Sequence, residues 1–86
     1  MFTTKASVPQ TRASIRIAQR LATVRSELFG ESGQPDIAKH VGVPVQSWRN
    51  FEGGVTAPPE VILKVLVLFA VEPNWLLNGE GPTFRA

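Results

Sequence analysis

A Gly-Val-Pro break at residues 42–44 separates two short amphipathic segments, and it constrains the fold more than any other feature of the chain. Before the break, Ile37, Ala38 and Val41 fall on one face of a helix with a period of about 3.6 residues. A glycine ends a helix readily because it tolerates positive φ, and a residue that precedes proline is driven out of the α region. We therefore expect the first segment to be a helix that ends at the glycine.

After the break, Val45, Trp48 and Phe51 recur at three-residue steps and so share one side of a second helix. The φ angle of Pro44 suits a first helical turn. A helix, a tight turn with glycine and another helix form the layout of a helix-turn-helix. This spacing places Trp48 in the core, although an exposed tryptophan there would suit a stacking or partner contact.

The periodicity of the whole chain predicts an all-α fold, a compact five-helix bundle without a sheet. The β-branched fourth segment also suits a buried strand, but the chain offers no partner strand, so we expect a helix. The apolar stripe of the first helix is Ile17, Leu21, Val24 and Leu28. The expected organisation is a flexible N-terminal arm at residues 1–10, a helix-turn-helix domain at 11–79, and a C-terminal tail at 80–86 with little to hold it. Within the domain we expect a first helix that runs to about residue 29, two short helices within 34–52 that are hinged at Gly42, and helices at about 59–69 and 74–77.

Length and composition favour one small domain. A chain of 86 residues buries ~60–65% of its unfolded surface. The absence of cysteine excludes disulfides and thiolate metal sites, and the single histidine, His40, cannot build a metal cluster alone. The apolar run 61–71 contains Lys64 and is shorter than the ~20 residues of a membrane span, and residues 1–10 lack the apolar segment of a signal peptide. We expect a soluble protein that suits a reducing cytoplasm, with no membrane contact, no metal and no cofactor.

The positive charges are concentrated near the N-terminus. The formal net charge is only +2, but Lys5, Arg12, Arg16, Arg20 and Arg25 follow one another with no acid between them. One basic end suits a phosphate backbone. The alternative is that these are ordinary solvated arginines on an exposed helix, and charge alone slightly favours that alternative.

Three motifs occur in order along the chain: Gln34-x-x-Ile-Ala-x-x-Val-Gly-Val, Glu52-x-Gly54 and Trp75-Leu-Leu-x-Gly79. With these motifs the chain resembles the Cro/repressor type of helix-turn-helix domain, as in lambdoid phage repressors and the wider xenobiotic-response-element family, over residues 20–82. The resemblance implies a lambda-repressor-like bundle that binds a palindromic double-stranded DNA operator as a homodimer. It implies a transcriptional regulator, most often a repressor, with half-sites ~34 Å apart.

The resemblance also implies roles for individual residues. Its second motif helix enters the major groove, so the residues expected to face base edges are Val45, Gln46, Arg49 and Asn50. Glutamine grips adenine and arginine grips guanine through two hydrogen bonds, each worth ~1–3 kcal/mol of discrimination. Val45 offers only apolar contact, for example with a thymine methyl group.

The same resemblance assigns residues to phosphates and to a structural ion pair. Gln34 matches the family position that contacts a backbone phosphate at a helix N-terminus, and we expect Lys39 and Arg20 to contact phosphates as well. Arg25 and Glu52 match a pair that ties the first helix to the end of the recognition helix, provided that the first helix and its turn are slightly longer than usual.

The chain departs from the family pattern where phosphates are commonly bound. Val43-Pro44 stands where a serine or threonine usually caps the recognition helix, and the loop at residues 53–57 has no basic or amide side chain. Fewer phosphate contacts predict modest non-specific affinity and a shallow dependence on salt. We therefore expect DNA binding to depend on dimerisation or on the basic N-terminal arm.

The fourth helix carries a second apolar stripe opposite its core face. Leu63, Val67 and Ala70 step by four and three residues, and an exposed apolar patch marks an interaction site. With Trp75 nearby, which also matches a family core position, this stripe is the expected dimer or partner interface. The alternative is that the N-terminal segment folds back over it.

A second class of function stays open. A protein-interaction module, adaptor-like or antitoxin-like, would keep the fold and bind a protein partner through the fourth helix or the surface around Val45 and Trp48. An enzyme is not expected, because the sequence offers no nucleophile with a base, no phosphate-binding glycine loop and no close carboxylate pair. Nothing in the sequence indicates a small-molecule ligand.

Overall fold

A computed structural model describes residues 12–85 as an all-helical bundle, which confirms the predicted fold class. Within this range no strand forms, and the only sheet-like contact is an isolated antiparallel bridge between Val71 and Phe84. The predicted N-terminal arm, residues 1–10, lies outside the described residues. The helices are α1 (Arg12–Phe29), α2 (Gln34–Val41), α3 (Val45–Glu52), α4 (Pro59–Leu68) and α5 (Pro73–Asn78).

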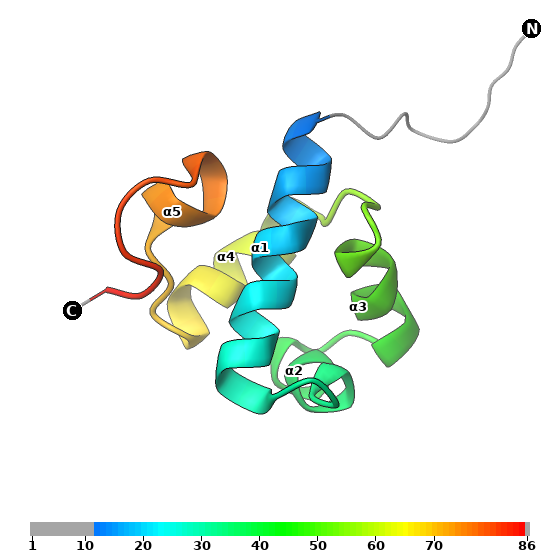
Figure 1. Ribbon diagram of the computed structural model, residues 1–86. Coiled ribbons are helices and arrows are strands. Elements are labelled where there is room, and N and C mark those ends of the chain that lie inside the picture. The colour runs from blue at the N-terminus through cyan, green and yellow to red at the C-terminus, as the bar shows by residue number, and fades with distance from the viewer. Residues whose placement is uncertain (1–11, 86) are drawn as a thin grey trace, which may run out of the picture.

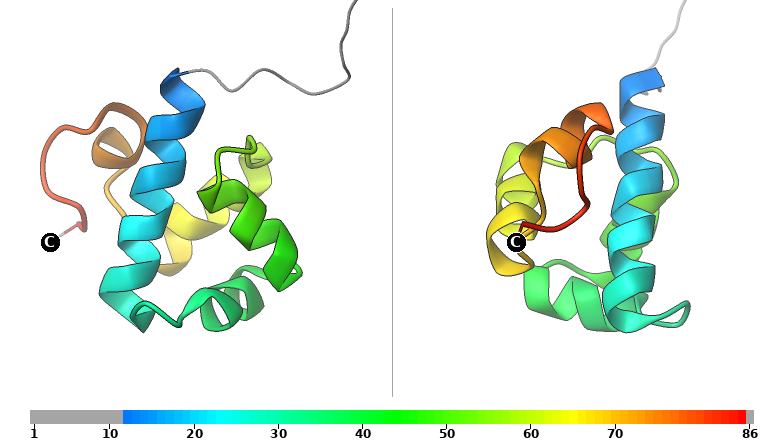
Figure 2. Two further views of the ribbon diagram at one scale, coloured as in Figure 1. Left: turned by 45° about the vertical axis from the view of Figure 1, so that its right-hand side comes forward. Right: turned by 60° about the vertical axis from the view of Figure 1, so that its left-hand side comes forward.

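The long helix α1 crosses the centre of Figure 1 in front of α4, and the right-hand view of Figure 2 shows that it forms one edge of the bundle. It packs against α2, α3 and α5, while α2 also packs against α4. In Figure 1, α3 and α5 lie on opposite sides of α1, and Figure 2 shows the same arrangement from two further directions. Contacts between elements far apart in sequence therefore close the bundle around one core.

Trp48 lies in this core with no exposed surface, as its spacing predicts. Burying a large apolar side chain contributes about 1.5–3 kcal/mol, so the core is the main source of stability. Its members come from every helix: Leu21, Val24, Ile37, Ala38, Val41, Trp48, Phe51, Val61, Val65, Val71 and Leu76.

The prediction that Leu28 belongs to the core stripe of α1 is wrong. Leu28 is 42% exposed, although Leu21 and Val24 on the same stripe are buried. A side chain is buried only where another element covers it. At the last turn of α1, His40 and Phe69 pack against Phe29 and not against Leu28. The ring of Phe29 lies 5.2 Å from that of His40 and 5.8 Å from that of Phe69, centroid to centroid.

The prediction that the C-terminal tail has little to hold it is also wrong. The backbone N–H of Glu72 donates to the carbonyl of Thr83 at 2.8 Å, and the N–H of Arg85 donates to the carbonyl of Ala70 at 2.7 Å. Phe84 packs against the core, and the chain runs back beside α5 to reach this position (Figure 2). A single bridge between Val71 and Phe84 is too short to produce the alternating pattern of a strand, so this pairing cannot be read from the sequence.

The ends of α4 and α5 differ by one residue from the predicted ranges 59–69 and 74–77. Helix α5 begins at Pro73 and ends at Asn78. Helix α4 ends at Leu68, because Ala70 takes a positive φ of 52° and turns the chain. Within residues 12–85, no helix combines the length and the hydrophobicity that crossing a membrane requires.

Candidate functional site

The turn between α2 and α3 has the geometry that the Gly-Val-Pro sequence predicts. Gly42 has φ of 87°, and its N–H donates to the carbonyl of Ala38 at 2.8 Å. Pro44 is extended, with φ of −60° and ψ of 147°, and it immediately precedes α3. Sequence reasoning missed Lys64, whose Nζ donates to the carbonyl of Val41 at 3.1 Å. This ammonium group from α4 satisfies the negative end of the α2 dipole.

Helix α3 has a buried side and an exposed side. Trp48 and Phe51 are 0% and 8% exposed, whereas Gln46, Arg49 and Asn50 are all exposed. We call these three exposed residues the outer face of α3. Because the core holds the opposite side of the helix, the direction in which the outer face points is set by the fold.

Val45 does not join the outer face. It was predicted to contact bases, but it is half-buried and packs against the core. The physical reason is its position one turn before Trp48, which turns it toward the same side of the helix. Apolar contact with a base from this residue is therefore limited to its remaining exposed edge.

The outer face is organised by hydrogen bonds within the chain. Gln46 Nε2 donates to Asn50 Oδ1 at 3.1 Å, one helical turn later. Arg49 Nε donates to Gln34 Oε1 at 3.0 Å and so links α3 to the first residue of α2. The three side chains are therefore held by neighbours and are not independent of one another.

The predicted ion pair between Arg25 and Glu52 is present. Arg25 donates through Nη2 to Glu52 Oε1 at 2.8 Å and through Nε to Oε2 at 3.0 Å, and the two side chains are only 13% and 8% exposed. The remaining terminal nitrogen of Arg25 donates to the carbonyls of Gly30 and Glu31. One arginine therefore connects α1, the end of α3 and the turn that precedes α2.

Glu52 also accepts two bonds that the sequence did not indicate. Trp48 Nε1 donates to Oε2, and Gln34 Nε2 donates to Oε1 at 3.0 Å. Among the side chains described, those of residues 15–85, every buried nitrogen or oxygen has a hydrogen-bond partner. A tryptophan at position 48 thus fills the core and also brings an N–H group to the carboxylate, which an aliphatic residue cannot do. We call Arg25, Gln34, Trp48, Arg49 and Glu52 the Glu52 network.

The network changes the titration of its charged members. Burial raises the pKa of Glu52, but the hydrogen bonds from Arg25, Gln34 and Trp48, together with the charge of Arg25, outweigh burial and hold that pKa below its ordinary value. The hydrogen bond to Glu52 raises the pKa of Arg25 in turn. Both groups are therefore charged at neutral pH.

The predicted phosphate contacts do not form one site. They are Gln34, Lys39 and Arg20. Arg20 Nη1 donates to the carbonyl of Leu76 at 3.1 Å, at the C-terminal end of α5. A Cβ atom on Gly79 would lie 2.6 Å from the other terminal nitrogen of Arg20, so the glycine leaves room for it. Arg20 thus stabilises the end of α5, where a cation is favoured, and its phosphate contact stays a prediction. Lys39 is exposed on α2.

The outer stripe of α4 is exposed, as predicted from its spacing. Leu63 is 60% exposed and Val67 is 70% exposed. Ala70 is exposed but lies beyond the end of the helix. Trp75 departs from the interface prediction, because it is half-buried and packs against the core. The prediction missed Leu68, which is 53% exposed.

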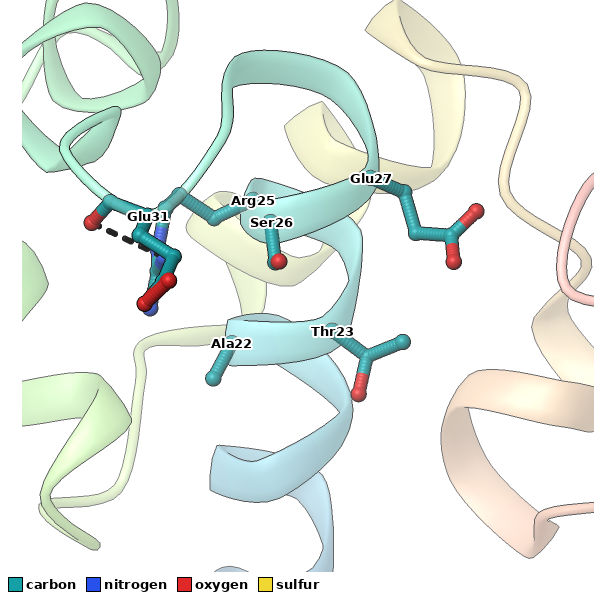
Figure 3. Close-up of a pocket in the computed structure, with 6 residues that line it drawn as sticks. All are labelled: Ala22, Thr23, Arg25, Ser26, Glu27 and Glu31. Carbon is teal, nitrogen blue, oxygen red and sulfur yellow. Dashed lines mark hydrogen bonds between the residues drawn. The ribbon is translucent and has the colours of Figure 1, made fainter.

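A polar depression of ≈ 450 Å³ lies on the outer surface of α1 and the turn after it. Figure 3 shows its residues, with the carboxylates of Glu27 and Glu31 on opposite sides of the helix. Arg25, which also lines it, is occupied by Glu52 and by backbone carbonyls. The depression therefore brings no pair of carboxylates together. Within residues 12–85, no group of three or more His, Asp or Glu side chains is arranged to hold a metal ion.

A comparison with known proteins adds no relative. No protein-family model, no curated protein and no solved structure matches this chain.

Proposed function

We propose that this protein binds double-stranded DNA sequence-specifically, with α3 in the major groove, and that it regulates transcription in a bacterial or phage setting. The observation that carries the proposal is the outer face of α3: Gln46, Arg49 and Asn50 are exposed together on a helix whose other side is buried. The major groove admits one α-helix, and amide and guanidinium groups are the side chains that distinguish base edges there. The resemblance of the three sequence motifs to repressor domains supports the same function. We expect the protein in the bacterial cytoplasm or nucleoid.

The chemistry of the outer face suits a site with guanine and adenine. Arg49 keeps both terminal nitrogens for the O6 and N7 acceptors of guanine. The bond between Gln46 and Asn50 leaves the oxygen of Gln46 as an acceptor and the nitrogen of Asn50 as a donor. Adenine presents the matching N6 donor and N7 acceptor, so the two amides offer a complementary pair.

The charge near the outer face predicts weak binding to DNA of arbitrary sequence. Lys39 and Arg49 are exposed, but Glu31 and Asp36 are exposed as well, and the charge of Arg25 is paired with Glu52. Non-specific affinity comes mainly from neutralised phosphates. A single copy therefore has little phosphate affinity, and a second copy or the basic residues near the N-terminus must supply it.

Replacing Arg49 or Asn50 by alanine is expected to abolish base preference at single positions of the operator. Each substitution removes one base contact, so discrimination should fall by ~1–3 kcal/mol, or about 5–150-fold in affinity for the preferred base. An operator is first selected from random duplexes, and binding is then measured on single-base variants of it. Lys39→Ala is the control, because losing a phosphate contact weakens all duplexes uniformly and lowers the salt slope by ~1.

If selection from random duplexes at low salt recovers no common motif, the proposal is wrong. The exposed α4 face would then favour the rival function, a module that binds another protein. Such a module would bind its partner equally well after Asn50→Ala.

The second copy in the proposed complex docks on α4. Its stripe of Leu63 and Val67 is exposed, and exposed apolar side chains on a helix gain stability when another surface covers them. A palindromic operator requires two copies related by a two-fold axis, and a second copy adds phosphate contacts that the low positive charge of one copy does not provide. We therefore propose a homodimer that packs this stripe against its own copy.

The double variant Leu63→Lys, Val67→Lys is expected to be monomeric. Charged side chains at the centre of a self-contacting interface repel one another and remain unpaired. Light scattering at concentrations where the unaltered chain is dimeric should give half the mass. Leu28→Lys, at an exposed leucine on α1, should leave the mass unchanged. Equal masses for the double variant and the unaltered chain would exclude this interface.

A further inference from the structure

We propose that Gln34 is a positioning residue for Arg49, which it holds ready for guanine, and that it is not primarily a phosphate contact. This inference rests on the proposed function and assigns the arginine of the outer face to one base. It begins from the amide of Gln34, which is bonded on both sides within the chain: Nε2 to Glu52 and Oε1 to Arg49.

The orientation of this amide follows from the chemistry of its two neighbours. A carboxylate accepts hydrogen bonds and a guanidinium group only donates them. The NH₂ group of Gln34 must therefore point toward Glu52, and its oxygen must then point toward Arg49. Reversing the amide would place an acceptor against a carboxylate and a donor against a guanidinium, so only one arrangement satisfies both neighbours.

The acceptor offered to Arg49 is fixed in space because Glu52 is itself fixed. Arg25 holds both carboxylate oxygens of Glu52 from α1, and the indole of Trp48, which is fully buried, holds one of them. The backbone of Gln34 starts α2 directly after the buried Gly33. A chain of hydrogen bonds therefore extends from the core to the exposed guanidinium of Arg49.

The hydrogen bond at Arg49 Nε limits the geometry in which its guanidinium group can pair with a base. Side-on pairing with guanine uses Nε together with one terminal nitrogen, whereas end-on pairing uses both terminal nitrogens. With Nε bonded to Gln34 at 3.0 Å, end-on pairing with O6 and N7 is the geometry left available. A free arginine also loses rotamer entropy on binding, and part of this loss has already occurred in the folded protein.

A phosphate contact by Gln34 would give a different pattern of affinity loss across duplexes. Both polar atoms of its side chain already have partners, so a phosphate oxygen would receive at most the second N–H of Nε2. Removing such a contact weakens all duplexes alike. Removing a positioning contact weakens only those duplexes that carry guanine opposite Arg49.

The test uses Gln34→Met, which keeps the length of the side chain and removes both polar atoms. Without DNA, nuclear magnetic resonance of the ¹⁵N-labelled protein should show an Arg49 Nε–H signal that exchanges slowly with water. In Gln34→Met this signal should exchange at the rate of an unbonded arginine. Gln46→Ala, on the same exposed face, should leave the signal unchanged.

With DNA, Gln34→Met should reduce the preference for guanine opposite Arg49 about tenfold, within the ~1–3 kcal/mol assigned to one base contact. Affinity for duplexes that lack this guanine should change little. The loss should not add to that of Arg49→Lys, because lysine lacks the paired donors that Gln34 orients. Additive losses would contradict the proposal.

Two outcomes separate the failure of this inference from the failure of the proposed function. Uniform weakening on all duplexes, with an unchanged Arg49 signal, would make Gln34 a phosphate contact and overturn the inference. If the unaltered chain selects no duplex, DNA recognition fails as the function and the inference falls with it, whatever the Arg49 signal shows.

Discussion

Replacing Glu52 by alanine is expected to lower the free energy of unfolding by ~3–5 kcal/mol, the range for removing one partner of a buried ion pair. The carboxylate accepts two bonds from Arg25, one from Gln34 and one from Trp48. Without it, the guanidinium of Arg25, whose side chain is only 13% exposed, and the indole N–H of the buried Trp48 lose their acceptor. Urea denaturation followed by far-ultraviolet circular dichroism measures this change.

The matched control for Glu52→Ala is Glu27→Ala, because Glu27 is exposed on α1 and such substitutions usually stay within ~0.5 kcal/mol.

The carboxylate of Glu52 should also affect the pH dependence of stability. Since the pKa of Glu52 is lower in the folded protein than its ordinary value of ~4.3, its contribution is full above that value and is lost as the pH falls through the folded pKa. A stability of Glu52→Ala within 1 kcal/mol of the unaltered chain, taking ~1 kcal/mol as a typical net hydrogen bond, would contradict the prediction.

Replacing Gly33 by alanine is expected to destabilise the fold by up to ~3 kcal/mol, the upper range for overpacking a tight site. The added Cβ would lie 2.3 Å from Phe29 Cβ and 2.6 Å from the Phe29 carbonyl oxygen. Relief requires the turn after α1 to move, and that turn carries the carbonyls that Arg25 binds. Thermal unfolding measured by calorimetry should show the loss.

Gly53→Ala provides the matched control for Gly33→Ala. The two glycines have nearly the same φ, −84° and −86°, so alanine costs the same backbone strain at both. At Gly53 the nearest atoms to an added Cβ are carbonyl oxygens at 3.4 Å, a distance that small shifts relieve. A destabilisation of equal size at both positions would show that crowding against Phe29 is not the cause.

The sequence predicted the helices well because their limits depend on local chemistry. Gly42 takes the positive φ that ends α2, and Pro44 takes the extended geometry that precedes α3. These preferences act within a few residues, so they can be read without the rest of the chain. The burial of Phe84 and the exposure of Leu28 could not be predicted in this way, because both depend on segments far away along the chain.

The candidate site was predicted in outline but not in its connections. The family resemblance assigned Gln46, Arg49 and Asn50 to the exposed side of α3, and all three are exposed. Spacing gave no sign that Gln34 would bond both Glu52 and Arg49. It likewise gave no sign that Arg20 would bind the end of α5, since long polar side chains choose among several partners within reach.

The sequence by itself determined the helices, the break between α2 and α3, and which side of each helix is apolar, because periodicity and backbone preference are local properties. Only the tertiary structure decided that the break at residues 42–44 brings the start of α2 beside the middle of α3. That approach lets one carboxylate, Glu52, collect donors from three helices. Hydrogen bonds need partners within about 3 Å, and the distances between segments exist only once the chain has folded.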